Sequence, residues 1–198
     1  RSELGAHQVL VKVKATSVNP IDWKLREGYL AQMMPWEFPI ILGWDVAGEI
    51  AAVGSEVQDW QVGQAVFARP ETTRFGTYAD YTIVDNHLLA KKPDSVSFED
   101  AAAVPLAGLT AYQALFTHGK LKAGERVLIH AGAGGVGIYA IQLAKNAGAF
   151  VITTASEKNH KLLKELGADQ VIDYHTTDFS EVLEDVDLRS EERRVGKE

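Results

Sequence analysis

A glycine-rich turn between an apolar run and a helical pattern limits what this chain can fold into. The stretch VLIHAGAGGVGIYAIQLAK, residues 127–145, places Gly132, Gly134 and Gly137 directly after a predicted strand and at the start of a predicted helix. In such a turn the first glycine permits the sharp bend, the second lets a phosphate approach the backbone, and the third lets the helix pack on the strand. The pattern predicts a dinucleotide-binding turn. A tight strand-to-helix turn without a ligand is the alternative.

The segments around this turn alternate between strand and helix patterns. We expect strands over residues 126–130, 150–154 and 169–174, with helices over about 136–147 and over EKNHKLLKELG, residues 157–167. This βαβαβ order is typical of the mononucleotide-binding half of a doubly wound parallel sheet. A linker helix is predicted to begin at Ser97, a good N-cap residue before a run of alanines. We therefore assign residues 98–188 to a partial Rossmann domain of the α/β class.

The N-terminal half has the pattern of a β protein. In HQVLVKVKATSV, Val9, Val11 and Val13 alternate with Leu10 and the lysines after it, and further short apolar runs up to about residue 93 are separated by Gly and Pro. Several short strands at this spacing predict a small barrel or sandwich. Residues 1–97 are therefore expected to form a separate β domain.

The end of the second predicted strand indicates which nucleotide the turn would bind. A carboxylate about 20 residues after the glycines would bind the ribose 2′-hydroxyl of NAD, but VITTASEKNHK has Ser156 at that place. Lys158 lies two residues further on, with a cation suited to a 2′-phosphate. The sequence favours NADPH over NADH, although the acidic residue Glu157 lies between Ser156 and Lys158. A solvated lysine in the first turn of a helix is the alternative for Lys158.

Composition excludes several classes of partner and chemistry. The net charge of −7 gives no attraction to nucleic acid or to an anionic membrane surface. Without cysteine there is no disulfide, no thiol nucleophile and no zinc site built from thiolates. No apolar run is long enough to span a bilayer, and no signal peptide is evident, so we expect a cytoplasmic location. Because the sequence starts without Met on the approach to a strand, we expect a truncated N-terminus.

The order of motifs resembles one protein family. SVNPIDWKLREG, LGWDVAGEI, FGTYADYTIVD, LTAYQAL, the glycine-rich stretch and LGADQVIDY together resemble the zinc-independent quinone oxidoreductase branch of the medium-chain dehydrogenase/reductases. The resemblance implies a GroES-like β-barrel domain with the substrate cleft, followed by the Rossmann domain with NADPH. It implies an oxidoreductase, quinone reductase-like or enoyl reductase-like, that transfers hydride to quinones or α,β-unsaturated carbonyls. The small molecule is the expected partner, and the parent protein is expected to be a homodimer.

The same resemblance bears on metal binding. Zinc-dependent cousins have a Cys, then a Gly-His-Glu motif; here Asn19 stands at the Cys position, and Gly43, Trp44 and Asp45 replace the second motif. Imidazole and thiolate are missing from both places, and the cysteines of the structural zinc loop are absent. No metal ligands are therefore expected, and hydride transfer would proceed without zinc.

By resemblance, the catalytic residues are Asn19, Tyr29 and Thr110. The amide of Asn19 is expected to donate a hydrogen bond to a substrate carbonyl as charge develops on it. Tyr29 would line the cleft or act as an acid, whereas Trp44 would face planar substrates and Asp22 would organise the loop. The alternatives are a turn-forming Asn19 and an exposed Tyr29.

Further residues are expected to contact the cofactor. Thr110 would lie on the nicotinamide side, and Tyr174 on the adenine side near the 2′-phosphate; a helix threonine and a strand-end aromatic are the alternatives. The predicted cofactor-binding set is Asn19, Thr110, Gly132, Gly134, Gly135, Val136, Gly137, Ser156, Lys158 and Tyr174.

The C-terminal ten residues depart from the family pattern. A fourth apolar strand is expected there, but EDVDL is followed by RSEERRVGKE, in which Val195 is the only apolar side chain. Buried parallel strands do not have such a composition, so residues 189–198 are predicted to be a foreign or disordered tail. The chain would then lack the second half of the Rossmann sheet. A noncatalytic NADP(H)-binding module is therefore the main alternative function, and a zinc-type alcohol dehydrogenase is a weaker one.

Overall fold

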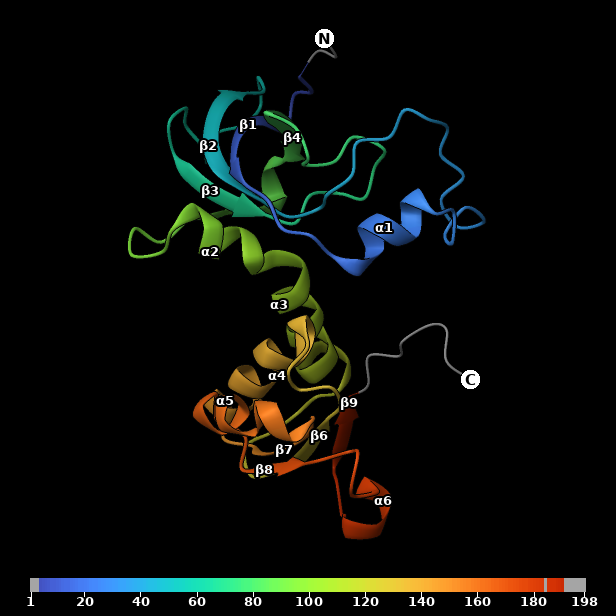
Figure 1. Cartoon of the computed structure of the whole chain (residues 1–198). Coiled ribbons are helices and arrows are strands. Elements are labelled where there is room, and N and C mark those ends of the chain that lie inside the picture. Colours follow the sequence, from blue (N-terminus) through green and yellow to red (C-terminus); the bar gives the residue numbers. More distant parts are fainter. Residues whose placement is uncertain (1–3, 184, 191–198) are drawn as a thin grey trace. The chain divides into compact units, whose positions relative to one another are not determined.

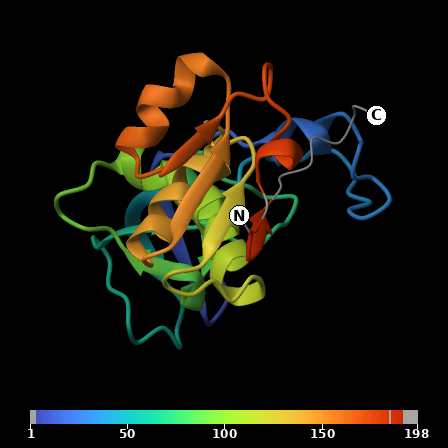
Figure 2. The same cartoon turned by 90° about the horizontal axis from the view of Figure 1, so that it is seen from below.

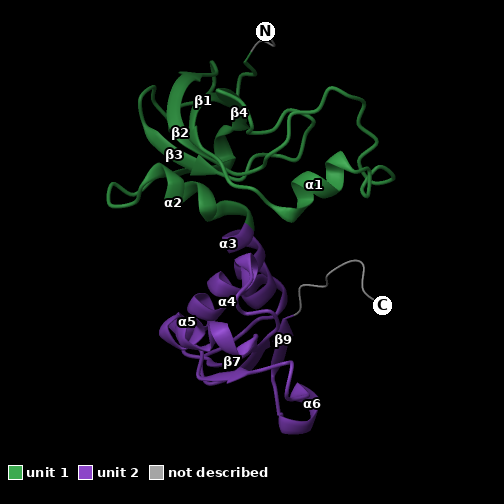
Figure 3. Ribbon diagram, viewed as in Figure 1, with its two compact units in different colours: residues 1–106 green, residues 107–198 purple. Residues whose placement is uncertain are grey.

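The fold was obtained as a computed structural model, which describes residues 4–183 and 185–190. The chain divides into two compact units, residues 1–106 and residues 107–198 (Figure 3). Among the described residues, no helix is long and apolar enough to cross a membrane.

Unit 1 is built on an antiparallel sheet (Figure 1). Its strands follow the order β4-β1-β2-β3-β5, and a 3₁₀ helix over Asn86–Leu88 precedes the last one. The strands are β1 (Gln8–Ala15), β2 (Val46–Val53), β3 (Ala65–Ala68), β4 (Tyr81–Asp85) and β5 (Leu89–Lys91). The predicted β character of the N-terminal half is thus confirmed.

Side chains that alternate along these strands form the core of unit 1. Val9 and Val11 of β1 are fully buried and pack with residues such as Ile50 and Val84 from the neighbouring strands. Successive residues of a strand point to opposite faces, so every second residue reaches this core. Trp60 packs against the cluster, and its indole N–H donates to the Asn86 carbonyl at 3.1 Å.

Two helices in unit 1 begin at residues that the sequence marks as helix starts. Helix α1 (Pro20–Arg26) has Asn19 as its N-cap and proline at its first position, where a missing N–H does not matter. Helix α2 (Phe98–Ala103) begins after Ser97, whose hydroxyl accepts the Asp100 backbone N–H at 3.0 Å. The predicted N-cap is therefore confirmed.

Helix α2 packs on the sheet of unit 1. Ala101 and Ala102 are buried against Ala47 of β2, with Phe67 and Phe98 beside them. The sequence prediction grouped residues 98–106 with the second domain, because they share the helical pattern of residues 107–118. Small alanine side chains instead let this helix lie close to the first sheet.

Unit 2 contains a parallel sheet with the strand order β8-β7-β6-β9 (Figures 1 and 2). In chain order these are the third, second, first and fourth strands, as in the first part of a Rossmann sheet. Its strands are β6 (Arg126–Ile129), β7 (Phe150–Thr154), β8 (Gln170–Ile172) and β9 (Leu188–Ser190). Its helices are α4 (Gly135–Asn146), α5 (His160–Glu165) and α6 (Phe179–Val182), and α3 (Pro105–Tyr112) crosses the unit boundary and continues as a π-helix over Gln113–His118.

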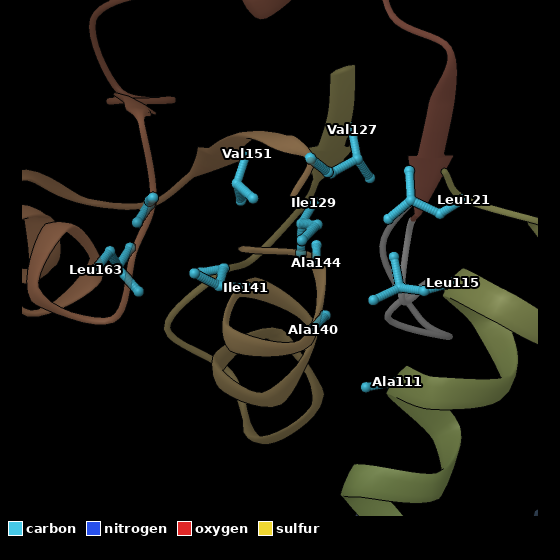
Figure 4. Packing of buried hydrophobic residues seen from close by; sticks show 13 residues of the cluster. Ala111, Leu115, Leu121, Val127, Ile129, Ala140, Ile141, Ala144, Val151 and Leu163 are labelled. Carbon is cyan, nitrogen blue, oxygen red and sulfur yellow. The ribbon is translucent and has the colours of Figure 1, made fainter. Parts of the chain in front are cut away.

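Both faces of the parallel sheet are covered. On one face, strand residues Val127, Ile129 and Val151 meet Ile141 of α4, with Leu115, Leu163 and other apolar residues around them (Figure 4). On the other face, Leu128, Ile152 and Ile172 pack with Phe179 and Leu183. Burial on both faces explains why the strands are almost continuously apolar.

The strand β9 lies where the sequence analysis predicted a disordered tail. Leu188, Arg189 and Ser190 pair in parallel with Val127, Leu128 and Ile129 of β6, so the prediction was wrong for the first residues of the tail. Strand pairing uses backbone groups, and β9 is the outer strand, so Arg189 can remain exposed. Its guanidinium lies 5.1 Å from the centre of the Phe179 ring. The rest of the predicted tail, residues 191–198, lies outside the described residues.

Candidate functional site

Two glycines of the G-x-G-x-x-G turn are required by packing. A Cβ on Gly132 would lie 2.0 Å from Thr153 Oγ1, and a Cβ on Gly137 would lie 2.5 Å from the Ala131 carbonyl oxygen. Ala131 itself has a positive φ of 52°, and its carbonyl accepts the Gly134 N–H at 2.8 Å. These contacts bring the start of α4 close to the end of β6, as the glycine spacing predicts.

Gly134 and Gly135 have a different environment. A Cβ on Gly135 would meet no atom within 4 Å, and a Cβ on Gly134 would approach only the Ala131 carbonyl oxygen, at 3.1 Å. The N-terminus of the twelve-residue helix α4 has Gly134 as its N-cap and no side-chain cap. The first backbone N–H groups of a helix, together with its dipole, favour an anion. The open space beside these two glycines therefore fits a phosphate group.

The remaining cofactor candidates lie just beyond the ends of neighbouring strands. Ser156 comes two residues after β7, Lys158 lies in the 3₁₀ helix Glu157–Asn159, and Tyr174 comes two residues after β8. Because β6, β7 and β8 are parallel, their carboxyl ends lie at one edge of the sheet. Lys158 and Tyr174 are exposed there, and Ser156 is half-buried.

In unit 1, Asn19 belongs to a buried polar cluster before α1. Its side-chain Nδ2 donates to Asp45 Oδ2 at 2.7 Å and to Ser17 Oγ at 3.1 Å. An amide group has only two N–H bonds to donate. These two acceptors are hydrogen-bonded to each other, so they lie on the same side of Nδ2, and the N–H bonds of an amide diverge too widely to reach both separately. The cluster therefore fixes the amide through one side of Nδ2, and the predicted hydrogen bond from Asn19 to a substrate carbonyl stays a prediction.

Asp45 is the centre of this cluster, and its side chain is fully buried. Besides Asn19, the Ser17 hydroxyl donates to Oδ2, and the Leu106 backbone N–H donates to Oδ1 at 2.7 Å. Burial raises the pKa of Asp45 above its usual value, and the nearby charge of Asp22 acts in the same direction, while the three hydrogen bonds oppose the shift.

Asp22 and Tyr78 form the outer part of the cluster. Asp22 Oδ2 accepts the Asn19 backbone N–H at 2.6 Å and the Tyr78 hydroxyl at 2.7 Å. These bonds agree with the organising role expected for Asp22. Partial burial raises the pKa of the Tyr78 phenol well above its usual value, and the hydrogen bond and negative charge of Asp22 raise it further.

Trp44 does not line a cleft, which corrects the sequence prediction. Its side chain is completely buried, and its ring lies 6.2 Å from that of Trp36, measured between centroids. Equivalence to a zinc-ligand position in relatives does not set the direction of a side chain, and here the indole fills the interior of unit 1. Its Nε1 atom is buried without a hydrogen-bond partner in the described part of the chain.

Tyr29 and Thr110 lie at the surfaces of their units. Tyr29 is 70% exposed, and its ring packs edge-on against Trp23 at 5.6 Å between centroids. Thr110 is an exposed residue of α3, one helical turn after Leu106. Their predicted roles stay predictions.

Asn19, which stands at a Cys position of the zinc-dependent cousins, is part of the hydrogen-bonded cluster. Asn19 and Asp45 bond to each other there. Across residues 4–183 and 185–190, no three His, Cys, Asp or Glu residues are grouped so that they could hold a metal ion. What the cluster offers instead is a set of oriented polar groups.

Comparisons with known proteins assign the family. The alcohol dehydrogenase GroES-like domain matches residues 5–94, and the zinc-binding dehydrogenase family matches residues 135–187. A chloroplast envelope quinone oxidoreductase homolog of Arabidopsis thaliana is 42% identical over 176 residues, or 86% of this chain. The chain belongs to the medium-chain dehydrogenase/reductases. Within this superfamily it falls in the quinone oxidoreductase branch, and the predicted GroES-like and Rossmann-like folds are confirmed.

Two further matches show the range of this branch. A trans-enoyl reductase of Aspergillus terreus is 39% identical and covers 89% of this chain. The crystal structure of the Escherichia coli quinone oxidoreductase complexed with NADPH has a TM-score of 0.81 at 34% identity, and the match covers 92% of this chain and 55% of that one. The chain covers 54% of the Arabidopsis relative and 51% of the Aspergillus relative, so it spans about half the length of the curated relatives it matches.

The sequence analysis missed two polar members of the cluster, Ser17 and Tyr78. Ser17 lies in the SVNPID motif, two residues before Asn19, so its hydroxyl group could have been identified from the sequence as a polar group near Asn19. Tyr78 is 56 residues away from Asp22 in the chain, and only the folded β structure brings them together. No pattern in the sequence alone connects those two residues.

Proposed function

We propose that the chain carries the substrate-binding and cofactor-binding parts of an NADPH-dependent oxidoreductase that acts without zinc. Its substrates are quinones or α,β-unsaturated carbonyls, which share a carbonyl conjugated to a carbon–carbon double bond. Unit 1 would bind the substrate and unit 2 the cofactor. The cytoplasmic location and the homodimeric parent stay predictions.

The observation that carries this proposal is the contrast within the glycine turn. Gly132 and Gly137 are needed for packing, but Gly135 has open space around it at the uncapped start of α4. Packing does not explain a glycine at that position, whereas an approaching pyrophosphate does. The Escherichia coli quinone oxidoreductase was solved in complex with NADPH, and the similarity of this chain to it supports NADPH as the cofactor.

Different residues of this chain would hold different parts of the cofactor and substrate. Backbone N–H groups at the start of α4 hold the pyrophosphate, and Lys158 with Ser156 binds the 2′-phosphate. Tyr174 lies beside the adenine, and Thr110 lies beside the nicotinamide. When bound, NADPH supplies a hydride to the conjugated system of the substrate. The Asn19 cluster orients the carbonyl, and Tyr29 lines the cleft or acts as an acid.

The absence of zinc from the proposed mechanism rests on the polar cluster. At the Cys position of the zinc-dependent cousins, Asn19 is engaged with Asp45, which also holds Ser17 and Leu106. An asparagine amide is not a zinc ligand of the usual kind. A zinc-type alcohol dehydrogenase is therefore the weaker alternative, and stoichiometric zinc in the purified chain would favour it.

A titration of the chain with NADPH and NADH, followed by nicotinamide fluorescence, tests the proposal. We expect NADPH to bind more tightly than NADH. The variant Gly135→Val should lower the affinity for NADPH by about tenfold or more, because the methyl groups of valine enter the space for the phosphate. Thermal unfolding of the same variant is the control for an intact fold. If neither nucleotide binds the wild-type chain, the proposal fails.

A second step separates an enzyme from a binding module. A quinone or an enone is added to the NADPH complex, and nicotinamide absorbance is followed. Loss of absorbance supports catalysis by this chain. Binding without loss favours a noncatalytic NADP(H)-binding module, which the half-length match to relatives makes the main alternative.

A further inference from the structure

The carboxylate of Asp45 joins two parts of unit 1 that are far apart in sequence. Oδ2 holds the Asn19 amide, 26 residues away, and Oδ1 holds the Leu106 backbone N–H, 61 residues away. Each oxygen therefore has its own partner. The residue lies immediately before β2, so its backbone is fixed by the sheet.

The donors that surround Asp45 are neutral groups. They are the Asn19 amide, the Ser17 hydroxyl and the Leu106 backbone N–H. Within residues 4–183 and 185–190, no ion pair is found for Asp45. A buried charge without a counter-ion is costly, so packing alone does not account for a carboxylate here.

The chemistry of the two partners explains why a carboxylate is needed. Both the Asn19 amide and the Leu106 N–H are donors, and they approach different oxygens. Among small side chains, only a carboxylate offers two acceptor oxygens in one plane. An asparagine of the same shape would offer one acceptor and would turn an NH₂ group toward one of the donors.

The Leu106 contact ties the carboxylate to a helix. Leu106 is the second residue of α3, so its N–H belongs to the first turn, where no intrahelical acceptor exists. A negative group at this end also complements the helix dipole. The first turn of α3 is thereby fixed, and Thr110 lies one turn further along the same helix.

We propose that Asp45 is a positioning residue that orients the Asn19 amide and, with its other oxygen, holds the first turn of α3. The role rests on the proposed function, in which Asn19 lies at the reacting end of the site. In this role Asp45 holds the Asn19 amide through one side of Nδ2, so that the orientation of the amide is set before any substrate arrives.

Amide exchange of the ¹⁵N-labelled chain tests this assignment without any cofactor. The side-chain signals of Asn19 are identified by their loss in Asn19→Ala, and the exposed Asn146 in the same sample is the reference. We expect the Asn19 side-chain hydrogen that faces Asp45 to exchange about tenfold more slowly than those of Asn146, because it is hydrogen-bonded to a buried carboxylate. Equal exchange rates for the two residues would overturn the proposal.

Asp45→Asn is the decisive variant. Its carbonyl oxygen is expected to keep the Leu106 N–H, while its NH₂ turns toward Asn19 and forces the Asn19 amide to flip. Exchange at the Asn19 side chain should then rise about tenfold, with Leu106 still protected. Asp45→Glu retains two acceptors and should restore part of the protection, and Asp59→Asn, at an exposed site in the same unit, should change nothing. An unchanged Asn19 rate in folded Asp45→Asn contradicts the assignment.

Ser17→Ala provides a test that does not depend on the folding of Asp45→Asn. This variant removes the longer of the two Asn19 contacts, 3.1 Å, and leaves the 2.7 Å contact with Asp45. Exchange at Asn19 should change less than about twofold. A tenfold rise would assign the positioning to Ser17 instead. If the amide results hold but the wild-type chain does not bind NADPH, the proposed function fails while the role of Asp45 in orienting Asn19 stands.

Discussion

The polar cluster of unit 1 and the glycine turn of unit 2 are held in place by different means. Asn19, Asp45 and Tyr78 are held by side-chain hydrogen bonds between residues that are 26 to 61 positions apart in sequence. The glycine turn is held by backbone packing within a few residues, with Thr153 as its distant neighbour. A substitution in the turn therefore meets atoms that cannot move, whereas a substitution in the cluster leaves polar groups without partners.

The largest loss of stability is expected from Gly137→Ala. Its Cβ would lie 2.5 Å from the Ala131 carbonyl oxygen and 2.7 Å from Gly132 Cα, both of which are backbone atoms. We expect the free energy of unfolding to fall by about 3 kcal/mol, since α4 must shift away from β6. Urea denaturation measures this change.

Gly135→Ala is the matched control for that variant. Its Cβ enters open space within the same turn, so the free energy of unfolding should change by less than about 1 kcal/mol. Equal losses in the two variants would show that packing does not distinguish the glycines, and a phosphate space at Gly135 would lose its support.

A smaller loss is expected from Asp22→Ala in the polar cluster. The variant removes the acceptor of the Asn19 backbone N–H and of the Tyr78 hydroxyl. We expect a loss of about 2 kcal/mol in the free energy of unfolding, because a buried donor remains without a partner. Asp59 is exposed, so Asp59→Ala should lower the free energy of unfolding, measured by urea denaturation, by less than about 0.5 kcal/mol. A similarly small effect for Asp22→Ala would mean that the cluster does not hold α1.

The titration of Tyr78 is sensitive to the same contacts. Partial burial, the hydrogen bond to Asp22 and the charges of Asp22 and Asp45 all raise the pKa of its phenol, so Tyr78 should ionise at a higher pH than a tyrosine of the unfolded chain. The folded state then keeps a proton that the unfolded state loses, and stability should fall as the pH rises above about 10.

Phenolate absorbance as a function of pH measures this ionisation. Tyr78→Phe should remove the last step, and Asp22→Asn should move that step toward lower pH, because it removes a neighbouring negative charge. A single transition for all tyrosines in the wild-type chain would rule out the contact between Tyr78 and Asp22 in solution.

The same comparison explains which features were predictable from the sequence. The glycine spacing, the β7 strand and the Ser97 cap depend on neighbours in the chain, and each was predicted close to its observed position. The burial of Trp44 and the contact of the Asn19 amide with Asp45 depend on residues that only the fold brings close.

The strand β9 shows a further reason for a wrong prediction. Its charged composition argued against a buried strand, but an edge strand needs only backbone pairing on one side, here with β6. Periodicity and composition report on side chains. They therefore recognise central strands better than edge strands.

The smallest effect on stability is expected from Lys158→Ala, and it tests the nucleotide preference of the turn. Lys158 is exposed in the 3₁₀ helix after β7, so the free energy of unfolding should change by less than about 0.5 kcal/mol. Affinity for NADPH should fall about fivefold, while affinity for NADH should stay unchanged, because only the former carries the 2′-phosphate. Lys164→Ala, an exposed lysine on α5, is the control and should alter neither affinity. Equal losses for both nucleotides would place Lys158 near a phosphate they share, and tighter binding of NADH by the wild-type chain would exclude the assigned roles of Ser156 and Lys158.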